Sequence, residues 1–156
     1  MSLVKLYQKL QKVVLALFLI LSFGLIFPVV AEATGLQNGQ LAPCPASPNC
    51  AVSQNADAQH AIEPIPYHVD RDTAYQTVLK VLTVVPRTEV VEKTDNYIHA
   101  LSKSRIFKFI DDVEFYFPAD ESVIHIRSAS RVGESDLGVN RRRLEQIRLA
   151  LKDLNI

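Results

Sequence analysis

An arginine-rich stretch, residues 127–143, holds the residue types that could bind an anion. Its sequence, RSASRVGESDLGVNRRR, contains five arginines, three serines and two glycines. Guanidinium groups match carboxylates and phosphates, and the free amides at the start of a helix favour the same ligands. One hypothesis is therefore a small-anion site at the start of the last helix. Its candidate residues are Arg127, Arg131, Ser135, Arg141 and Arg143.

The same stretch also has a purely structural interpretation. Arg127 would pair with Asp112 or Glu114, Asp136 would cap the last helix, and the two glycines would allow the turn between strand and helix. Charge networks of this kind are often only structural. Both interpretations stay open, and the acidic residues placed opposite the arginines favour the structural one.

The predicted hairpin Val113–Phe117 and Ser122–Ser130 should position these side chains, because its residues alternate between apolar and polar. Its apolar side chains should face the core; they are Val113, Phe115, Phe117, Ile124 and Ile126. Its polar face would hold Glu114, Tyr116, His125 and Arg127. Depending on the length of the loop, Glu114 lies opposite His125 or opposite Arg127. Each register pairs opposite charges across the strands, which contributes about 0.2–1 kcal/mol a pair.

Asn140 should lie on the buried side of the last helix, with Leu144 and Ile147. A buried amide needs partners, and Ser128 and Ser130 fall on the core-facing side of their strand. We therefore predict a hydrogen-bonded tie between strand and helix that needs no ligand. The full candidate polar network is Asp112, Glu114, His125, Ser128, Ser130 and Asn140.

Catalytic and metal-binding patterns are weak. The four histidines have no metal-ligand spacing, and there is no Gly-x-Ser-x-Gly motif. Glu114 with His125 could form an acid–base pair, whereas Asp111 and Asp112, as neighbours on a strand, point to opposite faces. The basic and aromatic residues 103–109 hint at nucleic acid, which an exported protein would not meet. The sequence predicts no catalytic residue, no metal site and no cofactor.

The elements that position these residues indicate an α+β fold. A helix should open at Asp70 and end before Pro86, and the last helix should begin after Ser135 or Asp136. That last helix is expected to bury Leu137, Leu144, Ile147, Leu151 and Leu154. Proline-containing Ile62–Tyr67 should form an extended edge segment. The predicted strands are Glu89–Glu92, Tyr97–Ser102, Ile106–Ile110, Val113–Phe117 and Ser122–Ser130. We expect an antiparallel sheet of four to five strands with both helices on one face, a two-layer sandwich spanning residues 60–156.

The N-terminus has the order of a secretory signal peptide. Lysines at 5, 9 and 12 precede an apolar run over 13–27, and Ala31-Glu32-Ala33 fits a cleavage site. We predict a signal peptide over 1–33 and export to the periplasm or the thylakoid lumen, with an uncleaved anchor as the alternative. Cleavage would leave 14 Lys+Arg and 16 Asp+Glu, since three lysines and one glutamate are removed. This balance gives no general attraction to nucleic acid or anionic membranes.

Residues 34–59 should form an irregular arm, because they are rich in Gly, Pro, Ala, Asn and Gln. The arm contains both cysteines of the chain, Cys44 and Cys50. In an exported chain, two nearby cysteines most simply form a disulfide. We predict that this bond closes the arm.

Three motifs in order carry a resemblance to a known family. They are Cys-Pro-x-Ser-Pro-Asn-Cys from residue 44, IFKFIDDVEF over 106–115, and the arginine-rich stretch over 127–143. With these the chain resembles the domain of unknown function 1499 family from about Cys44 to Leu151. Similar proteins occur in bacteria and photosynthetic lineages, so the resemblance implies an exported, cyanobacterial or chloroplast-like member. It implies a domain type and no activity.

Together these patterns predict an exported domain that binds or assists another molecule without catalysis. The partner would be a small anionic ligand or a protein, with no nucleic acid, and with membrane contact only through the signal peptide. The alternative is an enzyme or an anion-binding protein that uses the Arg/Asp/Glu/His face.

Overall fold

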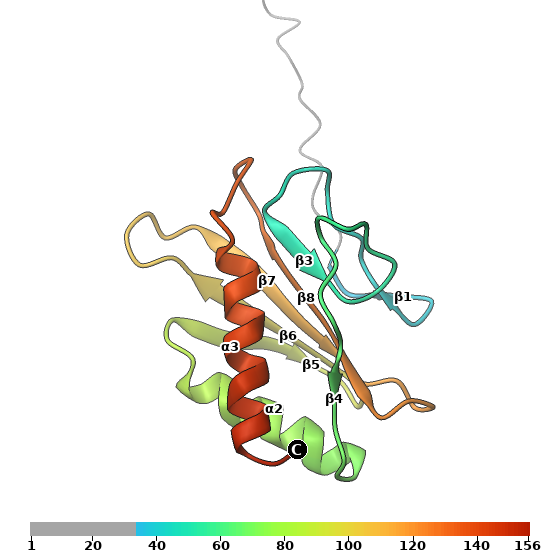
Figure 1. Cartoon of the computed structure of the whole chain (residues 1–156). Coiled ribbons are helices and arrows are strands. Elements are labelled where there is room, and N and C mark those ends of the chain that lie inside the picture. The colour runs from blue at the N-terminus through green and yellow to red at the C-terminus, as the bar shows by residue number, and fades with distance from the viewer. Residues whose placement is uncertain (1–33) are drawn as a thin grey trace, which may run out of the picture. The chain divides into compact units, whose positions relative to one another are not determined.

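The computed structural model describes residues 34–156 (Figure 1), so the predicted signal peptide lies outside the described residues. The short strands of the first part are β1 (Leu36–Gln37), β2 (Gln40–Leu41), β3 (Cys50–Val52) and β4 (Ile65–Pro66). The remaining elements are α2 (Arg71–Val84), β5 (Thr88–Lys93), β6 (Tyr97–Lys103), β7 (Ile110–Tyr116), β8 (Val123–Ser130) and α3 (Val139–Asp153).

One six-stranded antiparallel sheet forms the centre of the fold. Five strands follow the order β3-β8-β7-β6-β5, and β4 also pairs with β8. β3 pairs with the second half of β8 and β4 with its first residues, so these two short strands share one edge. β1 and β2 form a separate hairpin. The predicted α+β class is confirmed, although the main sheet has six strands rather than four to five.

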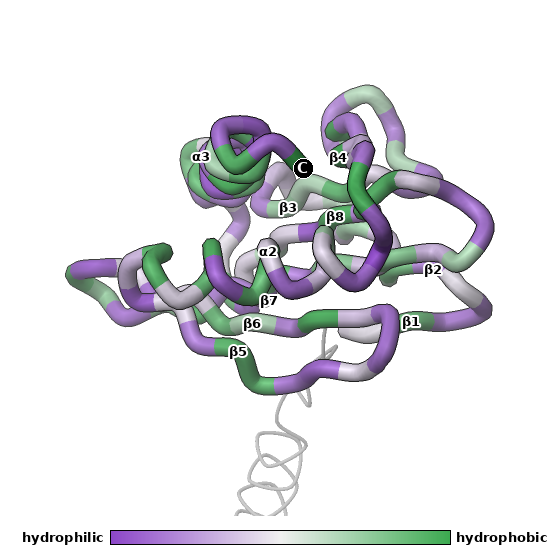
Figure 2. The backbone as a smooth tube through the Cα atoms, turned by 90° about the horizontal axis from the view of Figure 1, so that it is seen from below, coloured by the Kyte–Doolittle hydropathy of each residue, from purple (hydrophilic) through white to green (hydrophobic). Residues whose placement is uncertain are grey.

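Both helices pack on one face of this sheet, as Figure 1 shows. α3 contacts β8 and β3, whereas α2 contacts β5, and the two helices also touch each other. Seen from below in Figure 2, α3 accordingly lies towards the β3 side and away from β5. The core between helices and sheet includes Val78 and Leu82 of α2 and Leu144 and Leu151 of α3.

The two helices start in different ways. Asp70 caps α2, because its carboxylate accepts a hydrogen bond from the amide of Thr73 at 2.9 Å. α3 begins later than predicted, at Val139, after Gly138 in a left-handed conformation. Asp136 still serves the helix start, since its carboxylate accepts hydrogen bonds from the amides of Gly138 and Asn140.

The buried side of α3 is shorter than predicted. Leu137 is 85% exposed and Leu154 is 47% exposed, so the prediction that both are buried is wrong. Leu137 lies before the helix, where the turn breaks the helical periodicity. Leu144, Ile147 and Leu151 are buried as expected.

The hairpin β7–β8 has the predicted faces. All five side chains expected in the core are fully buried, and the observed register places Glu114 opposite Arg127 and Tyr116 opposite His125. The structure thus has the second of the two predicted registers. The first register, in which Glu114 would lie opposite His125, is not the one observed.

Two segment predictions are wrong. Ile106–Ile110 was expected as a strand, but β7 starts only at Ile110 and the preceding residues form a loop. Residues 34–59 were expected to be irregular, yet they contain β1, β2 and the sheet strand β3. These strands are two or three residues long, too short for an alternating pattern to reveal them.

The arm changes the environment of the sheet's second face. Leu41 of β2 and Val52 of β3 pack against Tyr97 of β6, with Leu36 and Tyr116 around them. The polar face predicted for the hairpin is therefore buried where the arm covers it: Glu114 and Arg127 are among the least exposed residues of the protein. We call this side the arm face and the opposite side the helix face.

Candidate functional site

On the arm face, a buried network forms around Glu114. Its carboxylate accepts hydrogen bonds from Arg127 Nη1 at 2.7 Å, from the Tyr97 hydroxyl at 2.7 Å and from the amide of Gly35 at 2.7 Å. Burial, together with the nearby Glu114 carboxylate, raises the pKa of Tyr97 well above its ordinary value, so its hydroxyl stays a donor. Arg127 Nε is buried without a hydrogen-bond partner among the described residues. The network fixes the arm to the sheet.

A second ion-pair network on the arm face forms around Asp112, two residues before Glu114 on β7. Arg131 binds Asp112 with two hydrogen bonds, of 2.9 and 2.8 Å, and His99 Nε2 contacts the same carboxylate at 2.7 Å. Burial alone would raise the pKa of Asp112, but the hydrogen bonds from His99 and Arg131 outweigh it and hold this pKa at about 2. Asp112 is therefore ionised at neutral pH. The same bonds raise the pKa of Arg131.

The helix face has a polar network of its own beneath the start of α3. Asn140 Oδ1 accepts from Ser128 Oγ at 2.5 Å, and Asn140 Nδ2 donates to Ser130 Oγ at 2.9 Å and to the Asn49 carbonyl at 2.8 Å. Arg143 adds a contact of 2.5 Å to Asp111 and a hydrogen bond of 2.7 Å to Asn140 Oδ1. The predicted tie between Asn140 and the two serines is present. It reaches further than predicted, to the backbone of the arm.

The candidate anion-binding residues do not converge. Arg127 and Arg131 lie on the arm face, where they bind Glu114 and Asp112. Arg143 lies on the helix face, because its partner Asp111 is the strand neighbour of Asp112 and points in the opposite direction. Arg141 donates to the backbone carbonyls of residues 59 and 61. Ser135 is exposed, and its hydroxyl accepts from the amide of residue 137.

His125 lies apart from both charge networks. Its ring stacks on Tyr116, with centroids 6.2 Å apart, and its Nδ1 is 3.2 Å from Ser53 Oγ. Burial lowers the pKa of His125, which favours the neutral ring. It lines a small polar cleft of about 310 Å³ together with residues 38–40, 118, 120 and 121. An acid–base pair of Glu114 and His125 is therefore not formed.

Tyr97 and His99 are the network members that sequence reasoning missed. Both lie on β6, whose alternation puts them on one face, and their strand is paired with β7. His99 is directly opposite Glu114 and binds Asp112, which lies two residues before Glu114 on β7. The period-two pattern of residues 97–103 was the signal that could have revealed them. Gly35 and Asn49 join through backbone groups, which leave no sequence signal.

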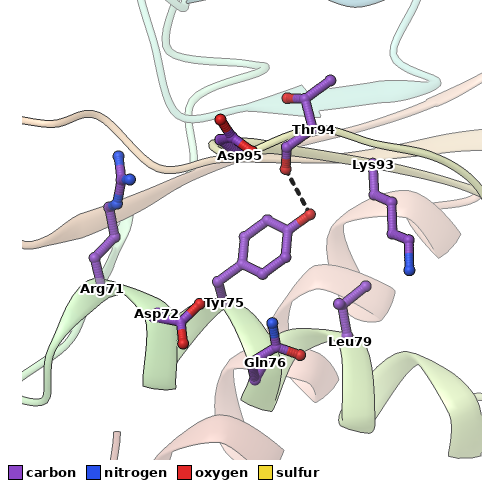
Figure 3. Close-up of a pocket in the computed structure, with 8 residues that line it drawn as sticks. All are labelled: Arg71, Asp72, Tyr75, Gln76, Leu79, Lys93, Thr94 and Asp95. Atoms are coloured by element: carbon purple, nitrogen blue, oxygen red, sulfur yellow. Dashed lines mark hydrogen bonds between the residues drawn. The ribbon is translucent and has the colours of Figure 1, made fainter.

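A second polar cleft, of about 520 Å³, lies between α2 and the β5–β6 turn. Figure 3 shows the residues that line it. Tyr75 crosses from the helix and donates to the Thr94 carbonyl at 2.7 Å, which joins the two walls. Burial and the nearby Asp95 raise the pKa of Tyr75. Arg71 and Lys93 bring cations to the rim, balanced by Asp72 and Asp95, so the cleft has no net preference for either sign.

The described residues show neither a metal centre nor a membrane span. No group of three or more His, Cys, Asp or Glu side chains in residues 34–156 could hold a metal ion. No helix of this part combines the length and apolar character needed to cross a membrane. The disulfide is confirmed: Cys44 and Cys50 are bonded, with their Cα atoms 5.6 Å apart.

The fold and the networks define a small α+β domain in which charged side chains bind one another inside the protein. Its sheet has helices on one face and a disulfide-closed arm on the other. The family model described as "Protein of unknown function (DUF1499)" matches residues 40–151. The chain belongs to this family. Searches of the curated proteins and of the solved structures gave no match.

Proposed function

We propose that this protein is an exported, non-catalytic binding or accessory domain of the periplasm or the thylakoid lumen. The observation that carries the proposal is that the arginines of residues 127–143 already have acceptors within the protein. Arg127, Arg131 and Arg143 each bind a carboxylate, and Arg141 binds two carbonyls. Side chains committed in this way hold the arm, sheet and last helix together, and the partner would be bound elsewhere on the surface.

Export is supported by the disulfide and by the predicted signal peptide. A disulfide persists in oxidising compartments and is rare in the cytosol. Intact-mass analysis of the protein recovered from its host tests this proposal. We expect a chain that starts at Thr34 and has no free thiol before reduction. Retention of residues 1–33 would contradict cleavage, and two free thiols would contradict an oxidising compartment.

A small-anion site at the edge of the arm face is the second candidate function. The Arg131 side chain is 45% exposed, unlike those of Arg127 and Arg143, so an anion could still approach it. A related candidate is an enzyme that uses the same Arg/Asp/Glu/His face. His99, held by Asp112, would then be the group that exchanges protons.

Thermal melts with and without phosphate or a dicarboxylate separate these functions. The proposed binding domain should show no anion-dependent rise in Tm, because its arginines are already paired. A rise that is lost in Arg131→Ala and kept in Arg142→Ala would establish the anion site instead. Arg142 is the matched control, since it is exposed on the same segment and binds only the Leu137 carbonyl.

A further inference from the structure

The β6–β7 loop, residues 104–109, has a defined conformation at one end of the sheet (Figure 1). Ser104 closes it twice: its amide donates to the Phe109 carbonyl at 2.9 Å, and its hydroxyl accepts from the Phe109 amide at 2.9 Å. Lys108 adopts a left-handed conformation with φ 58°, which is uncommon for a residue other than glycine. These hydrogen bonds hold the loop backbone in one conformation, which sets the directions of its side chains.

In this conformation the loop exposes three large apolar side chains. Ile106 is 76% exposed, Phe107 73% and Phe109 50%, and the two phenyl rings stack with centroids 5.5 Å apart. Single exposed apolar residues are normal, but contiguous ones mark interaction sites. No described part of the chain covers these three.

The loop also concentrates positive charge. Lys103, Arg105 and Lys108 form no ion pair with any described residue, and residues 103–109 contain no acidic side chain. Residues 34–156 have 14 Lys+Arg and 16 Asp+Glu, so without these three cations the rest carries 11 against 16, a net charge of −5. The acidic residues that are nearest in the sequence, Asp111 and Asp112, are bound by Arg143 and Arg131.

The neighbouring β8–α3 loop extends the apolar end. The Arg131 amide donates to the Ile110 carbonyl at 3.0 Å, which places the two loops at the same end of the sheet (Figure 1). Val132 is 58% exposed, and Leu137, 85% exposed, has φ 54°. Strained backbone often occurs at functional sites, so the exposed Leu137 side chain is consistent with a contact at this surface. This loop also carries Glu134, so its role is peripheral to that of residues 103–109.

We propose that residues 103–109 form a docking loop for an anionic phospholipid surface. Ile106, Phe107 and Phe109 would enter the interface between headgroups and acyl chains, while the three cations contact the phosphates. The three apolar side chains expose roughly 300–400 Å², taking about 200 Å² for each when fully exposed. A stable protein interface needs about 800 Å² per partner, so the loop fits a bilayer better than a protein. The inference rests on the proposed binding role and names its partner, and it revises the expectation that the membrane is met only during export.

The protein contains no tryptophan, which allows a direct test in the full chain. Phe107→Trp places a single fluorophore on the loop. Leu149→Trp is the matched control, because Leu149 is also exposed, at 58%, but on α3. With vesicles that contain phosphatidylglycerol, we expect the emission of the loop tryptophan to shift to shorter wavelength and to be quenched by brominated acyl chains. The control tryptophan should do neither, even if residues 1–33 bind the chain to the vesicle.

Removing the charge tests the same contact from the other side. In the Phe107→Trp background, Lys103→Ser, Arg105→Ser and Lys108→Asn should each weaken the loop's vesicle affinity by about fivefold, since a cation near an anionic surface contributes about that factor. Asn is chosen at 108 because it tolerates the left-handed conformation. Pure phosphatidylcholine vesicles should give little or no shift.

Three outcomes would overturn the inference. One is an unchanged loop emission with anionic vesicles, and a second is an equal response from both tryptophans. The third is a shift that depends on protein concentration without vesicles, which assigns the loop to a second copy of the chain. None of these would touch the proposed export and binding role, which fails separately if the native N-terminus, the disulfide or the anion melts contradict it.

Discussion

Two segments of this protein, residues 127–143 and residues 103–109, are both rich in Lys and Arg but lie in different environments. In the first, Arg127 is buried against Glu114, and Arg143, whose side chain is only 11% exposed, binds Asp111. In the second, cations and phenyl rings face solvent with no acidic partner among the described residues. The difference teaches that a dense arginine motif can be internal structure, because paired charges are unavailable to a ligand. Unpaired charge beside exposed apolar surface is the better indicator of a contact.

Arg127→Met should give the largest effect on stability. It leaves the Glu114 carboxylate buried without its cation, and breaking a buried ion pair costs about 3–5 kcal/mol. Urea unfolding of the purified variant measures this loss. Adding Glu114→Gln should recover much of it, since Gln can still accept from Tyr97 and carries no charge.

A loss below about 0.5 kcal/mol, the range of ordinary surface substitutions, would show that Arg127 is not needed by the interior. Arg127 would then again be a candidate for binding an anionic ligand. Arg105→Met is the matched control from the exposed segment, and it should stay within that small range.

Asn140→Ala should have an intermediate effect. The variant leaves Ser128, Ser130 and the Asn49 carbonyl without their buried partner, which costs ~1–3 kcal/mol. Asn140→Leu should recover part of this through apolar burial. Thermal and urea unfolding measure both, with Arg142→Ala as the exposed control on the same helix. Equal stability of Asn140→Ala and wild type would mean that the helix does not depend on this tie.

Asp112 should make folding sensitive to acid. Its pKa is held at about 2, below the ordinary 3.8, so its contribution is complete above pH 3.8 and is lost as the pH falls through 2. The shift corresponds to about 2 kcal/mol. Unfolding free energies measured across this range should fall with a shallower slope in Asp112→Asn than in wild type. Identical slopes would contradict a carboxylate stabilised by His99 and Arg131.

The sequence predicted the sheet and one network because both depend on local periodicity. Alternation gave the core face of β7 and β8, and the helical wheel placed Asn140 over Ser128 and Ser130. The register between β7 and β8 stayed open, since it depends on how the turn closes. β3 was missed because three residues cannot show a pattern.

Other errors arose where backbone conformation overrides residue type. Ile106–Ile110 is rich in the β-branched and aromatic residues typical of strands, but Lys108 adopts a left-handed conformation and the segment before Ile110 forms a loop. Leu137 fits the helical stripe, but it also adopts a left-handed conformation before α3 starts. The burial of Glu114 could not be predicted either, because the arm that covers it shows no periodicity. In each case long-range packing or a turn decided the outcome.

The docking loop should give the smallest effect on stability, and this sharpens the contrast between the two segments. Phe107→Ser removes a ring that is 73% exposed. Lys108→Asn introduces a residue that tolerates the left-handed conformation, with φ 58°, at this position. Each should change the free energy of unfolding by less than about 0.5 kcal/mol, because neither side chain has a buried partner to lose. Removing Lys103, Arg105 and Lys108 together relieves repulsion among like charges, so at low salt the variant should be as stable as wild type or slightly more so. Urea unfolding at low and high salt measures both. A loss above 1 kcal/mol in Phe107→Ser, in the range typical of a damaging substitution, would mean that the loop packs against the domain and that its exposed surface is structural rather than a contact.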